Sequence, residues 1–509
     1  MSEESAGNER VEGVKKVTVT ERVKEVMSQK DKWLKYVATA VCLFLLLRVC
    51  LNLAYALAAP YQTFKDCFYY KGIALFLAVL ILMRRVSFLN LPVLATIAVY
   101  VAASVNHFTA ATYEAELRNA MISKCVAWGL FLIILVDVIR TGKSTRFHKE
   151  NKVFVCMAMI AFSGALAMSL QSSLCLFCPF VALYLTPISK KKWIWFTDCL
   201  TAAYYGAFVW VMTKSLITIP YAGENIRNGY YYGFFQSPWS VGVFCAGAFA
   251  CVTYWFVKFW NAEKREPLKW IPCLMAMAFP VYTTLIAASR SAEIGIMGCA
   301  LFAFLFATSK AKKSWKKRGI GVLVAALVVI TCGILLLWFL SNVDVDPMET
   351  GQFARWKRVA KRMFAAEPKA TDYFQSPFLT AMDALMSSRL QLLVEAVKNV
   401  PLFGRGDMSV VIGEIDYGHP HNTYAAWLLM YGWLGGIPMI VWFFGFLVRS
   451  IRGVLKRELI YLFPLLWGGF LAFAILPEFL PWMYPAAFIL FYAQYPLLVE
   501  QAEDDVERV

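Results

Sequence analysis

The sequence is poor in charge and holds only four histidines. Of its 509 residues 17% are charged, against about 25% in a typical soluble protein. Hydrophobic residues make up 60% of the chain, and its mean hydropathy is +0.56. This composition excludes an ordinary soluble domain. Backbone surrounded by lipid must satisfy its own hydrogen bonds, so we expect an all-α, polytopic bundle of transmembrane helices.

Two signatures of cofactor chemistry are missing. The chain has no GxxxxGK loop for nucleotide phosphates. The CxxC pair, Cys175 and Cys178, has no second pair and no nearby histidine, so it does not predict a metal site. The 13 cysteines stand mostly inside apolar runs, which is typical of small buried side chains and not of a disulfide framework. We expect no metal and no other cofactor.

The net charge of +16 comes mainly from Lys and Arg in short loops between apolar runs. Membrane topology requires this placement, because basic loops stay in the cytoplasm, so we expect no nucleic-acid partner. If the N-terminus is cytoplasmic, every dense basic cluster in a short loop falls on the same side. These loops are Arg84–Arg85, Arg140–Lys152, Lys190–Lys192, Asn261–Lys269, Lys310–Arg318 and Arg449–Arg457. Both termini are then predicted to be cytoplasmic.

Apolar runs predict about fourteen spans, or twelve if the short pair 153–170 and 173–188 is re-entrant. The predicted spans are 34–58, 67–83, 89–106, 121–139, 153–170, 173–188, 193–217, 239–260, 270–288, 292–308, 320–340, 423–448, 460–475 and 483–498. A polar leader precedes the first run, which is longer than the core of a signal peptide. We therefore expect Leu34–Ala58 to be a retained anchor.

These spans divide the chain into five predicted parts. They are a cytoplasmic tail (1–33), a transmembrane region (34–340), a large extracytoplasmic loop (341–422), C-terminal transmembrane helices (423–498) and an acidic cytoplasmic tail (499–509). The large loop is the only predicted outer segment long enough to fold. Its apolar residues recur at helical spacing in 352–364 and in 380–400, where Pro401 ends the pattern. We expect amphipathic helices in this loop.

An outer location restricts the chemistry, because ATP and nucleotide-activated donors are normally absent there. A donor that is already activated and linked to a lipid can arrive through the bilayer, and such donors carry a pyrophosphate. Arginine suits this group, since its planar guanidinium binds phosphate oxygens in pairs. The leading candidates are Arg290, in a turn between two apolar runs, and Arg389, in the large loop. The alternatives are an interfacial arginine paired with Glu293 and a solvated helix face.

Other cations of the outer segments are weaker candidates for binding the substrate. Arg227 lies in the second-largest outer loop. Arg355, Arg358 and Arg362 share one face of the predicted helix 352–364. That face would bind a phosphate or a lipid headgroup, or would be exposed to solvent without binding a ligand.

His421 is the candidate general base. Asn422 or Thr423 is a typical N-cap for the apolar helix that follows. A histidine at a helix N-terminus favours its neutral form, and a neutral imidazole can take a proton from a sugar hydroxyl. His419 is a weaker candidate, and Asn422 is a possible contact to the substrate. The alternative is a polar residue at a membrane interface.

Four landmarks stand in a fixed order over roughly residues 220–448. They are G-x-F-x-x-P at Gly233–Pro238, S-R-[GS] at Ser289–Ser291, R…P-x-x-G-x-G at Arg389 and Pro401–Gly406, and H-N-x9-G-x-x-G from His421 to Gly435. In this pattern the chain resembles the O-antigen ligase and polymerase family of bacterial envelope proteins. The last landmark is the most specific. Trp239 departs from the family, which often has Asn after the first landmark.

The resemblance implies a metal-independent glycosyltransferase of the bacterial inner membrane. Its donor would be an undecaprenyl-pyrophosphate-linked glycan, used on the extracytoplasmic face. Arg290 and Arg389 would hold the pyrophosphate, and His421 would activate the acceptor hydroxyl. A ligase transfers to a sugar of the lipid core and a polymerase to another glycan chain, and both remain open, as do capsule and wall polymer. The other implied partners are membrane lipid and other polysaccharide-assembly proteins.

Two rival interpretations come from other classes of protein. A flippase for lipid-linked oligosaccharides usually has ionisable residues near the middle of the membrane. Here charges inside the spans are few, and Arg48 is the main one. A non-catalytic assembly protein would need only the large loop to recruit other envelope enzymes.

Overall fold

A computed structural model of the chain provides the structure. It describes residues 33, 36–37, 39–44, 46–47, 50–51, 129, 132, 135–136, 138–140, 142, 144–149, 152–153, 184–219, 226–227, 230–231, 233–235, 238–262, 264–307, 327, 331, 333–343, 352–364, 373–385, 389–405, 407, 409–418, 420, 422–456, 458–474, 489 and 493–500. Most of the spans predicted before residue 184 therefore lie outside the described residues.

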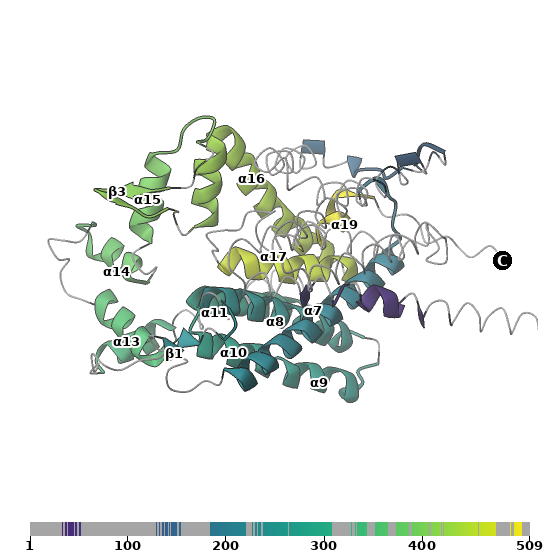
Figure 1. Cartoon of the computed structure of the whole chain (residues 1–509), viewed down its shortest axis with the longest axis horizontal. Coiled ribbons are helices and arrows are strands. Elements are labelled where there is room, and N and C mark those ends of the chain that lie inside the picture. The colour runs from purple at the N-terminus through teal and green to yellow at the C-terminus, as the bar shows by residue number, and fades with distance from the viewer. Residues whose placement is uncertain are drawn as a thin grey trace, which may run out of the picture.

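The described elements are helices and two short hairpins, which confirms the predicted all-α class (Figure 1). The helices are α7 (Lys190–Thr218), α8 (Pro238–Trp260), α9 (Pro267–Ala276), α10 (Ala278–Ala287), α11 (Arg290–Ala307), α13 (Gln352–Met363), α14 (Pro377–Leu385), α15 (Leu390–Lys398), α16 (Thr423–Leu455), η3 (Leu459–Tyr461), α17 (Leu462–Ala474) and α19 (Tyr495–Leu498). The strands are β1 (Ile226–Arg227) with β2 (Tyr230–Tyr231), and β3 (Val411–Ile412) with β4 (Ile415–Asp416); both pairs are antiparallel.

Helix α8 is the centre of the bundle and contacts α7, α9, α10, α11 and α17. Its small residues explain this position, because they let neighbouring helices approach closely. A side chain at Gly242 would meet the Ser289 hydroxyl at 2.5 Å, and one at Gly247 would meet the Tyr204 hydroxyl at 2.5 Å. The described cysteines are all buried except Cys273, as predicted.

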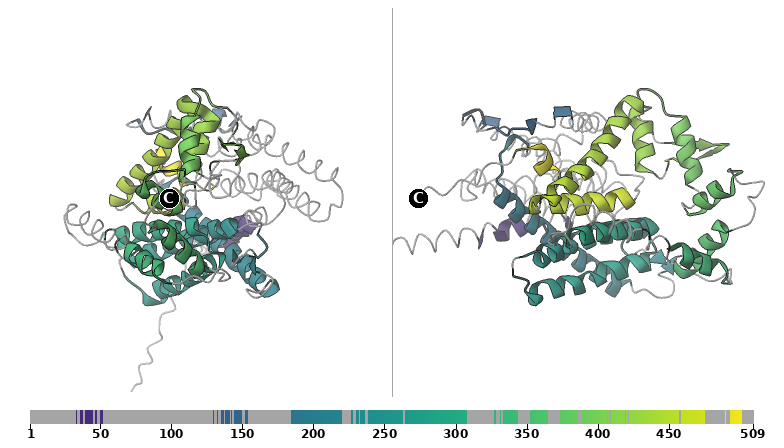
Figure 2. Two further views of the ribbon diagram at one scale, coloured as in Figure 1. Left: turned by 90° about the vertical axis from the view of Figure 1, so that its left-hand side faces the viewer. Right: turned by 180° about the vertical axis from the view of Figure 1, so that it is seen from behind.

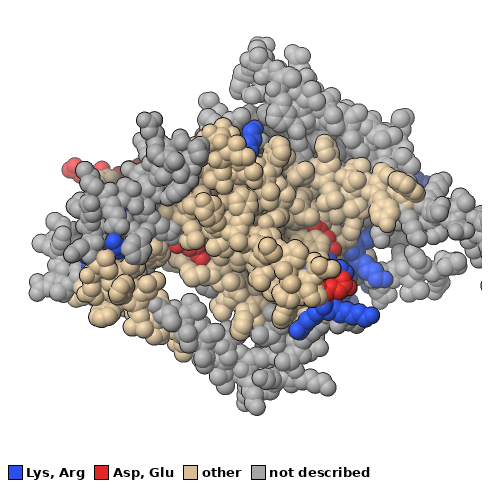
Figure 3. All heavy atoms as spheres, turned by 90° about the horizontal axis from the view of Figure 1, so that it is seen from below, with Lys and Arg blue, Asp and Glu red and all other residues tan. Residues whose placement is uncertain are grey.

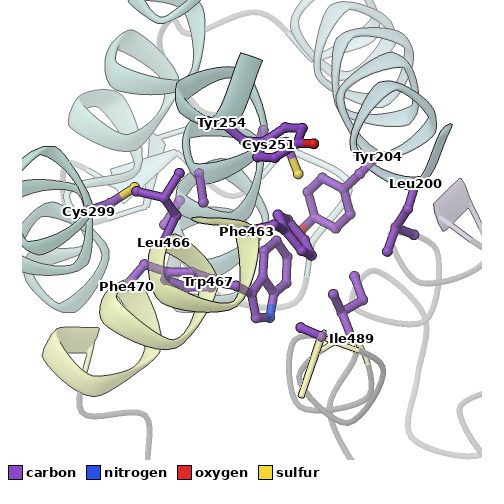
Figure 4. Packing of buried hydrophobic residues seen from close by; sticks show 14 of the residues in the cluster. Leu200, Tyr204, Cys251, Tyr254, Cys299, Phe463, Leu466, Trp467, Phe470 and Ile489 are labelled. Carbon is purple, nitrogen blue, oxygen red and sulfur yellow. The ribbon is translucent and has the colours of Figure 1, made fainter. Parts of the chain in front are cut away.

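Aromatic side chains fill the space between α7, α8 and α17 (Figure 4). The Tyr204 ring meets the edge of Trp467 with ring centroids 5.4 Å apart, and Tyr204 donates a hydrogen bond to the carbonyl of Phe244. Trp467 also packs edge-on against Phe470 at 5.1 Å. Large rings on one helix thus occupy the room left by small residues on the next.

Helices α9 and α10 turn their apolar side chains outward. Leu268, Met275, Tyr282 and Leu285 are exposed, although the sequence here is apolar. Viewed from below, this side of the molecule is a broad uncharged band, and its charged side chains gather mainly at one end (Figure 3). Such a surface is suited to lipid and not to water.

Three described helical segments are long and apolar enough to cross a membrane: Ser240–Trp260, Pro267–Ala287 and Thr423–Leu455. They agree with the predicted spans 239–260, 270–288 and 423–448. The chain is therefore an all-α membrane protein. The predicted runs 193–217, 292–308 and 460–475 are also helical, as α7, α11 and α17.

Helix α16 is not the single straight helix that the run 423–448 predicts. Gly432 has φ 69° and ψ −175° inside it. In a straight helix Tyr424 and Phe444 would lie about 30 Å apart, but their rings stack with centroids 5.5 Å apart. The helix therefore folds back at Gly432, where a left-handed backbone suits glycine. A first arm (423–431) packs against a second arm (433–455), which is itself long enough to span a bilayer.

The described residues of the large loop form three helices where the sequence predicts two. Helix α13 agrees with the predicted helix 352–364, whereas the predicted helix 380–400 is divided into α14 and α15. Asp383 explains the second start. Its carboxylate is buried in α14 and accepts hydrogen bonds from the backbone N–H groups of Leu390 at 2.9 Å and Gln391 at 3.3 Å, so it caps α15.

Candidate functional site

Arg290 is the first residue of α11, at a tight turn from α10. Ala288 has φ 51° and is the only residue other than glycine with a positive φ among the described residues. Such a backbone costs free energy, and it is held here by the close contact of Ser289 with Gly242 of α8. The turn therefore fixes where the half-buried Arg290 side chain leaves the bundle.

The large loop reaches back to this arginine. The guanidinium carbon of Arg290 lies 5.9 Å from the ring centroid of Trp356 in α13, within the range of a cation–π contact. The sequence does not indicate that Trp356 contacts Arg290. It shows only that Trp356 belongs to the apolar face of a basic helix.

Helix α13 brings a dense group of cations to the same place. Its sequence, QFARWKRVAKRM, has five Lys or Arg and no acidic residue. Arg358 and Lys361 are exposed, whereas Lys357 is buried. The backbones of Arg355 and Arg362 lie in α13, but their side chains lie outside what the structure describes, as does that of Arg227 in β1. The helix that contacts Arg290 through Trp356 is therefore itself positively charged.

Arg389 immediately precedes α15, and its carbonyl accepts the N–H of Leu393 at 3.0 Å. Its side chain is half-buried. The N-terminus of α15 is already capped by the carboxylate of Asp383. Any binding of an anion here would therefore fall to the Arg389 guanidinium and not to the helix end.

Asn422 is the N-cap of α16, as the sequence predicts. Its side-chain oxygen accepts hydrogen bonds from the N–H groups of Tyr424 at 3.0 Å and Ala425 at 3.1 Å. The side chain is buried, so this residue has a structural task whether or not it contacts a substrate. His421 and His419 lie outside the described residues. Asn422, the residue that follows His421, fixes where α16 begins.

Two of the landmarks meet at the fold of α16. The N–H groups of Trp433 and Leu434 donate to the carbonyls of Pro401 at 3.1 Å and Leu402 at 3.2 Å, and the N–H of Arg405 donates to the carbonyl of Leu429 at 2.9 Å. These bonds satisfy backbone groups that the interrupted helix leaves free. We call this contact between 401–405 and 429–434 the glycine junction.

Glycine is required on both sides of the junction. A side chain on Gly404 would meet the carbonyl oxygen of Met430 at 2.2 Å, and one on Gly432 would meet the N atom of Gly404 at 2.3 Å. Both residues also have a positive φ, 83° and 69°. The P-x-x-G and G-x-x-G patterns thus have a structural explanation.

The junction sets the direction of the two helices that lead into it. Helix α15 ends at Lys398 and the first arm of α16 ends at Tyr431, so the junction joins their C-terminal ends. The two also share a small apolar core that contains Leu392 and Leu429, and they lie side by side (Figures 1 and 2). They therefore run in parallel, and Arg389 and Asn422 lie at the same end of the pair.

A chain of contacts connects this pair to Arg290. Trp356 joins α11 to α13, and α13 contacts α14, which contacts α15. Figure 1 shows these loop helices gathered at one end of the bundle. The structure thus places Arg290, Arg389 and Asn422 at the same end of the molecule. They are connected through the contacting helices α11, α13, α14 and α15 and the first arm of α16.

These features define a multi-pass helical membrane protein with a cationic, folded loop at one end of its bundle. Comparison with protein families narrows this class. Residues 275–440 match the family model described as O-antigen ligase, so the chain carries an O-antigen ligase-like domain. The resemblance seen in the sequence is thereby confirmed. The matched segment includes Arg290, Arg389, His421 and the glycine junction, but not Arg227 or Gly233–Pro238. Searches of curated proteins and of solved structures gave no match.

Proposed function

We propose that the chain is a membrane glycosyltransferase of the O-antigen ligase type. It takes a glycan from an undecaprenyl-pyrophosphate donor and transfers it to a hydroxyl acceptor on the extracytoplasmic face of the bacterial inner membrane. The observation that carries this proposal is the contact between Arg290 and Trp356. It places a turn between two apolar helices, where a lipid-linked group arrives, against the most basic helix of the loop.

In this mechanism the arginines bind the donor. Arg290 and Arg389 hold the pyrophosphate oxygens through charge-assisted hydrogen bonds, and α13 adds positive potential around them. Arg355, Arg358 and Arg362 are proposed to contribute to this potential, with Arg227 and His419 as further candidates for contacts to the substrate. Charge that develops on the leaving pyrophosphate is then neutralised in the transition state, which is where stabilisation accelerates a reaction.

His421 activates the acceptor. Its neutral imidazole takes the proton of the acceptor hydroxyl while the oxygen attacks the anomeric carbon of the donor sugar. A new C–O bond forms, the bond between that carbon and the pyrophosphate oxygen breaks, and undecaprenyl pyrophosphate leaves with the electron pair. No nucleotide, metal ion or other cofactor is used in these steps. Asn422 holds the end of α16 that follows this base.

The test is a reconstitution of the purified protein in lipid vesicles with a lipid-linked glycan and an acceptor, without ATP or added metal. We expect glycan transfer, and we expect His421→Ala to slow it by roughly 10²–10⁴-fold, as for loss of a general base. Arg290→Ala and Arg389→Ala should also impair transfer. The matched controls are His148→Ala and Arg265→Ala, which lie in loops away from the proposed site and should leave transfer unchanged.

Other results would point to other proteins. Transfer that survives both His421→Ala and Arg290→Ala would refute the site. Movement of the glycan across the membrane without bond exchange would identify a flippase. If the protein neither transferred nor moved the glycan, a non-catalytic assembly protein would be the remaining interpretation. The acceptor that is used distinguishes a ligase from a polymerase, since only the polymerase extends another lipid-linked chain. The H-N-x9-G-x-x-G landmark from His421 to Gly435 favours the ligase.

A further inference from the structure

The second arm of α16 has an exposed apolar stripe. Its members share one face of the helix, because they are spaced alternately three and four residues apart. They are Leu434, Ile437, Val441, Phe444 and Val448, and all are between 43% and 57% exposed. This arm belongs to a helix that is long and apolar enough to cross a membrane, so the stripe is the part of its surface that faces lipid.

Two residues outside the helix extend this stripe. Leu402 is 54% exposed, and Phe403 is 78% exposed. The glycine junction holds them against the top of the arm, since the carbonyl of Leu402 accepts the N–H of Leu434. A loop that faced only water would have little reason to present two large apolar side chains at a rigid turn.

The residues at the border of this surface are those of a membrane interface. Trp433 is partly exposed beside Leu434, and tryptophan is enriched where acyl chains meet headgroups. Arg405 follows the apolar pair, is exposed, and donates from its guanidinium to the carbonyl of Ser409 at 2.6 Å. The sequence from Gly432 to Val448 contains no charged residue. Apolar, aromatic and basic residues therefore follow in the order that a bilayer imposes.

The place of the junction in the fold agrees with this order. Along the length of the bundle, the fold of α16 lies near the ends of α11 and α17, whereas α14 lies farther out (Figures 1 and 2). The glycine junction, which carries Leu402 and Phe403, therefore lies at the end of the bundle that bears the loop helices.

We propose that Leu402 and Phe403 insert into the outer leaflet of the membrane, among its acyl chains. Membrane lipid is the occupant because the pair continues a surface that already faces lipid. The assignment to the outer leaflet rests on the proposed function. Insertion anchors the glycine junction, and with it the parallel pair α15 and α16, at the level where the pyrophosphate of a lipid-linked donor lies.

The test places a photoreactive benzoylphenylalanine at position 403 of the full chain. Matched variants carry it at Phe444, within the lipid-facing stripe, and at Phe378, which is 70% exposed on α14. Each protein is reconstituted in vesicles of phosphatidylethanolamine and phosphatidylglycerol, irradiated and analysed by mass spectrometry. We expect lipid adducts at 403 and 444 and a several-fold lower yield at 378. The replacement adds a benzoyl group to phenylalanine side chains that are 47–78% exposed, so the fold should persist.

Two results would overturn the proposal. A lipid yield at 403 no higher than at 378 would show a turn that faces water. A crosslink from 403 to another copy of the chain, in place of lipid, would show a different occupant. The adduct does not depend on transfer, and His421→Ala should give the same adducts. Failure of lipid insertion and failure of the proposed reaction are therefore distinguishable.

Discussion

The Glu395 side chain joins α15 to the segment before α14. Lys398 donates to its carboxylate at 2.8 Å, Tyr373 donates to the same oxygen, and Lys398 also donates to the Tyr373 hydroxyl at 2.9 Å. The hydrogen bond from Lys398, followed by that from Tyr373, lowers the pKa of Glu395 below its ordinary value. The same partners raise the pKa of Lys398.

These shifts predict a pH window for the contact. A carboxyl group with a lowered pKa stabilises the fold above its ordinary value, about 4.3, and loses this contribution as the pH falls through the lowered value. The raised pKa of Lys398 has the opposite sign, so its contribution is lost only in strong alkali. We expect residues 373–376 to be held less firmly against α15 below about pH 4. Faster amide hydrogen exchange of this segment, corrected for intrinsic rates, would report it.

The control for this prediction is Glu395→Gln. Because glutamine does not titrate here, the variant should show the same exchange at pH 7 and at acid pH. If the wild-type segment kept its protection in acid, Glu395 would not be what holds it.

Single residues also show what the sequence could predict of the site. The S-R-S turn and the N-cap at Asn422 are local patterns, and the structure has both where the sequence placed them. The contact of Arg290 with Trp356 is not local. It depends on how the loop returns to the bundle, and no periodicity within α11 or α13 contains that information.

At the level of whole elements, α16 gains its shape from the glycine junction. The first arm, α15 and the β3–β4 hairpin share a small apolar core that includes Val410 and Ile412. The second arm packs instead with α17 and α19. Gly432 therefore separates an arm that packs with α15 from an arm that packs with α17 and α19, and Trp427 and Met430 also connect the first arm to the main core of the bundle.

This boundary predicts that Gly404→Ala is costly. The new side chain would meet the carbonyl oxygen of Met430 at 2.2 Å at a residue with φ 83°. A left-handed alanine costs roughly 1–2 kcal/mol, and overpacking costs roughly 1–3 kcal/mol more. We expect a lower midpoint of thermal unfolding in detergent and, because α15 and α16 lose their alignment, slower glycan transfer.

Gly413→Ala is the matched control for the backbone cost alone. Gly413 has φ 63°, but no atom lies within 4 Å of a side chain placed there. Its substitution should cost only the roughly 1–2 kcal/mol of the left-handed conformation and leave transfer unchanged. Equal losses of stability in the two variants would mean that the junction can accommodate a side chain.

The helices also show how much of the fold the sequence could predict. Hydropathy identified the existence and approximate bounds of α8, of the span formed by α9 and α10, and of α17, because these segments are apolar along their length. It could not show the fold of α16, since a glycine with positive φ leaves the hydropathy unchanged. The division of α14 from α15 was equally hidden, because it depends on a hydrogen bond that the Asp383 carboxylate accepts from the N–H of Leu390 across the break.

Across the part of the molecule that the structure describes, several segments predicted to be cytoplasmic contact one another. Lys190 at the start of α7 forms an ion pair of 2.9 Å with Glu458, which follows the predicted basic loop Arg449–Arg457. The N–H of Glu500 donates to the carbonyl of Arg146 at 2.7 Å, so the C-terminal segment joins another predicted cytoplasmic loop. The loop helices α13 and α14 gather at the opposite end (Figure 2). The contacting segments and the loop helices thus lie at opposite ends of the described part of the molecule, and which end is cytoplasmic stays a prediction.

The grouping makes the orientation testable with two insertions of a protease site. One is placed between Gly413 and Glu414, at the exposed turn of the β3–β4 hairpin, and the other between Lys264 and Arg265, in the exposed loop after α8. Basic loops are retained in the cytoplasm, so protease added outside intact spheroplasts should cut only the first site. Permeabilised cells should show both cuts, which controls for access to each loop. The reverse pattern would put the basic loops outside and the large loop inside. The arginines of the large loop would then face the ATP-containing cytoplasm, and the case for a lipid-linked donor would fail.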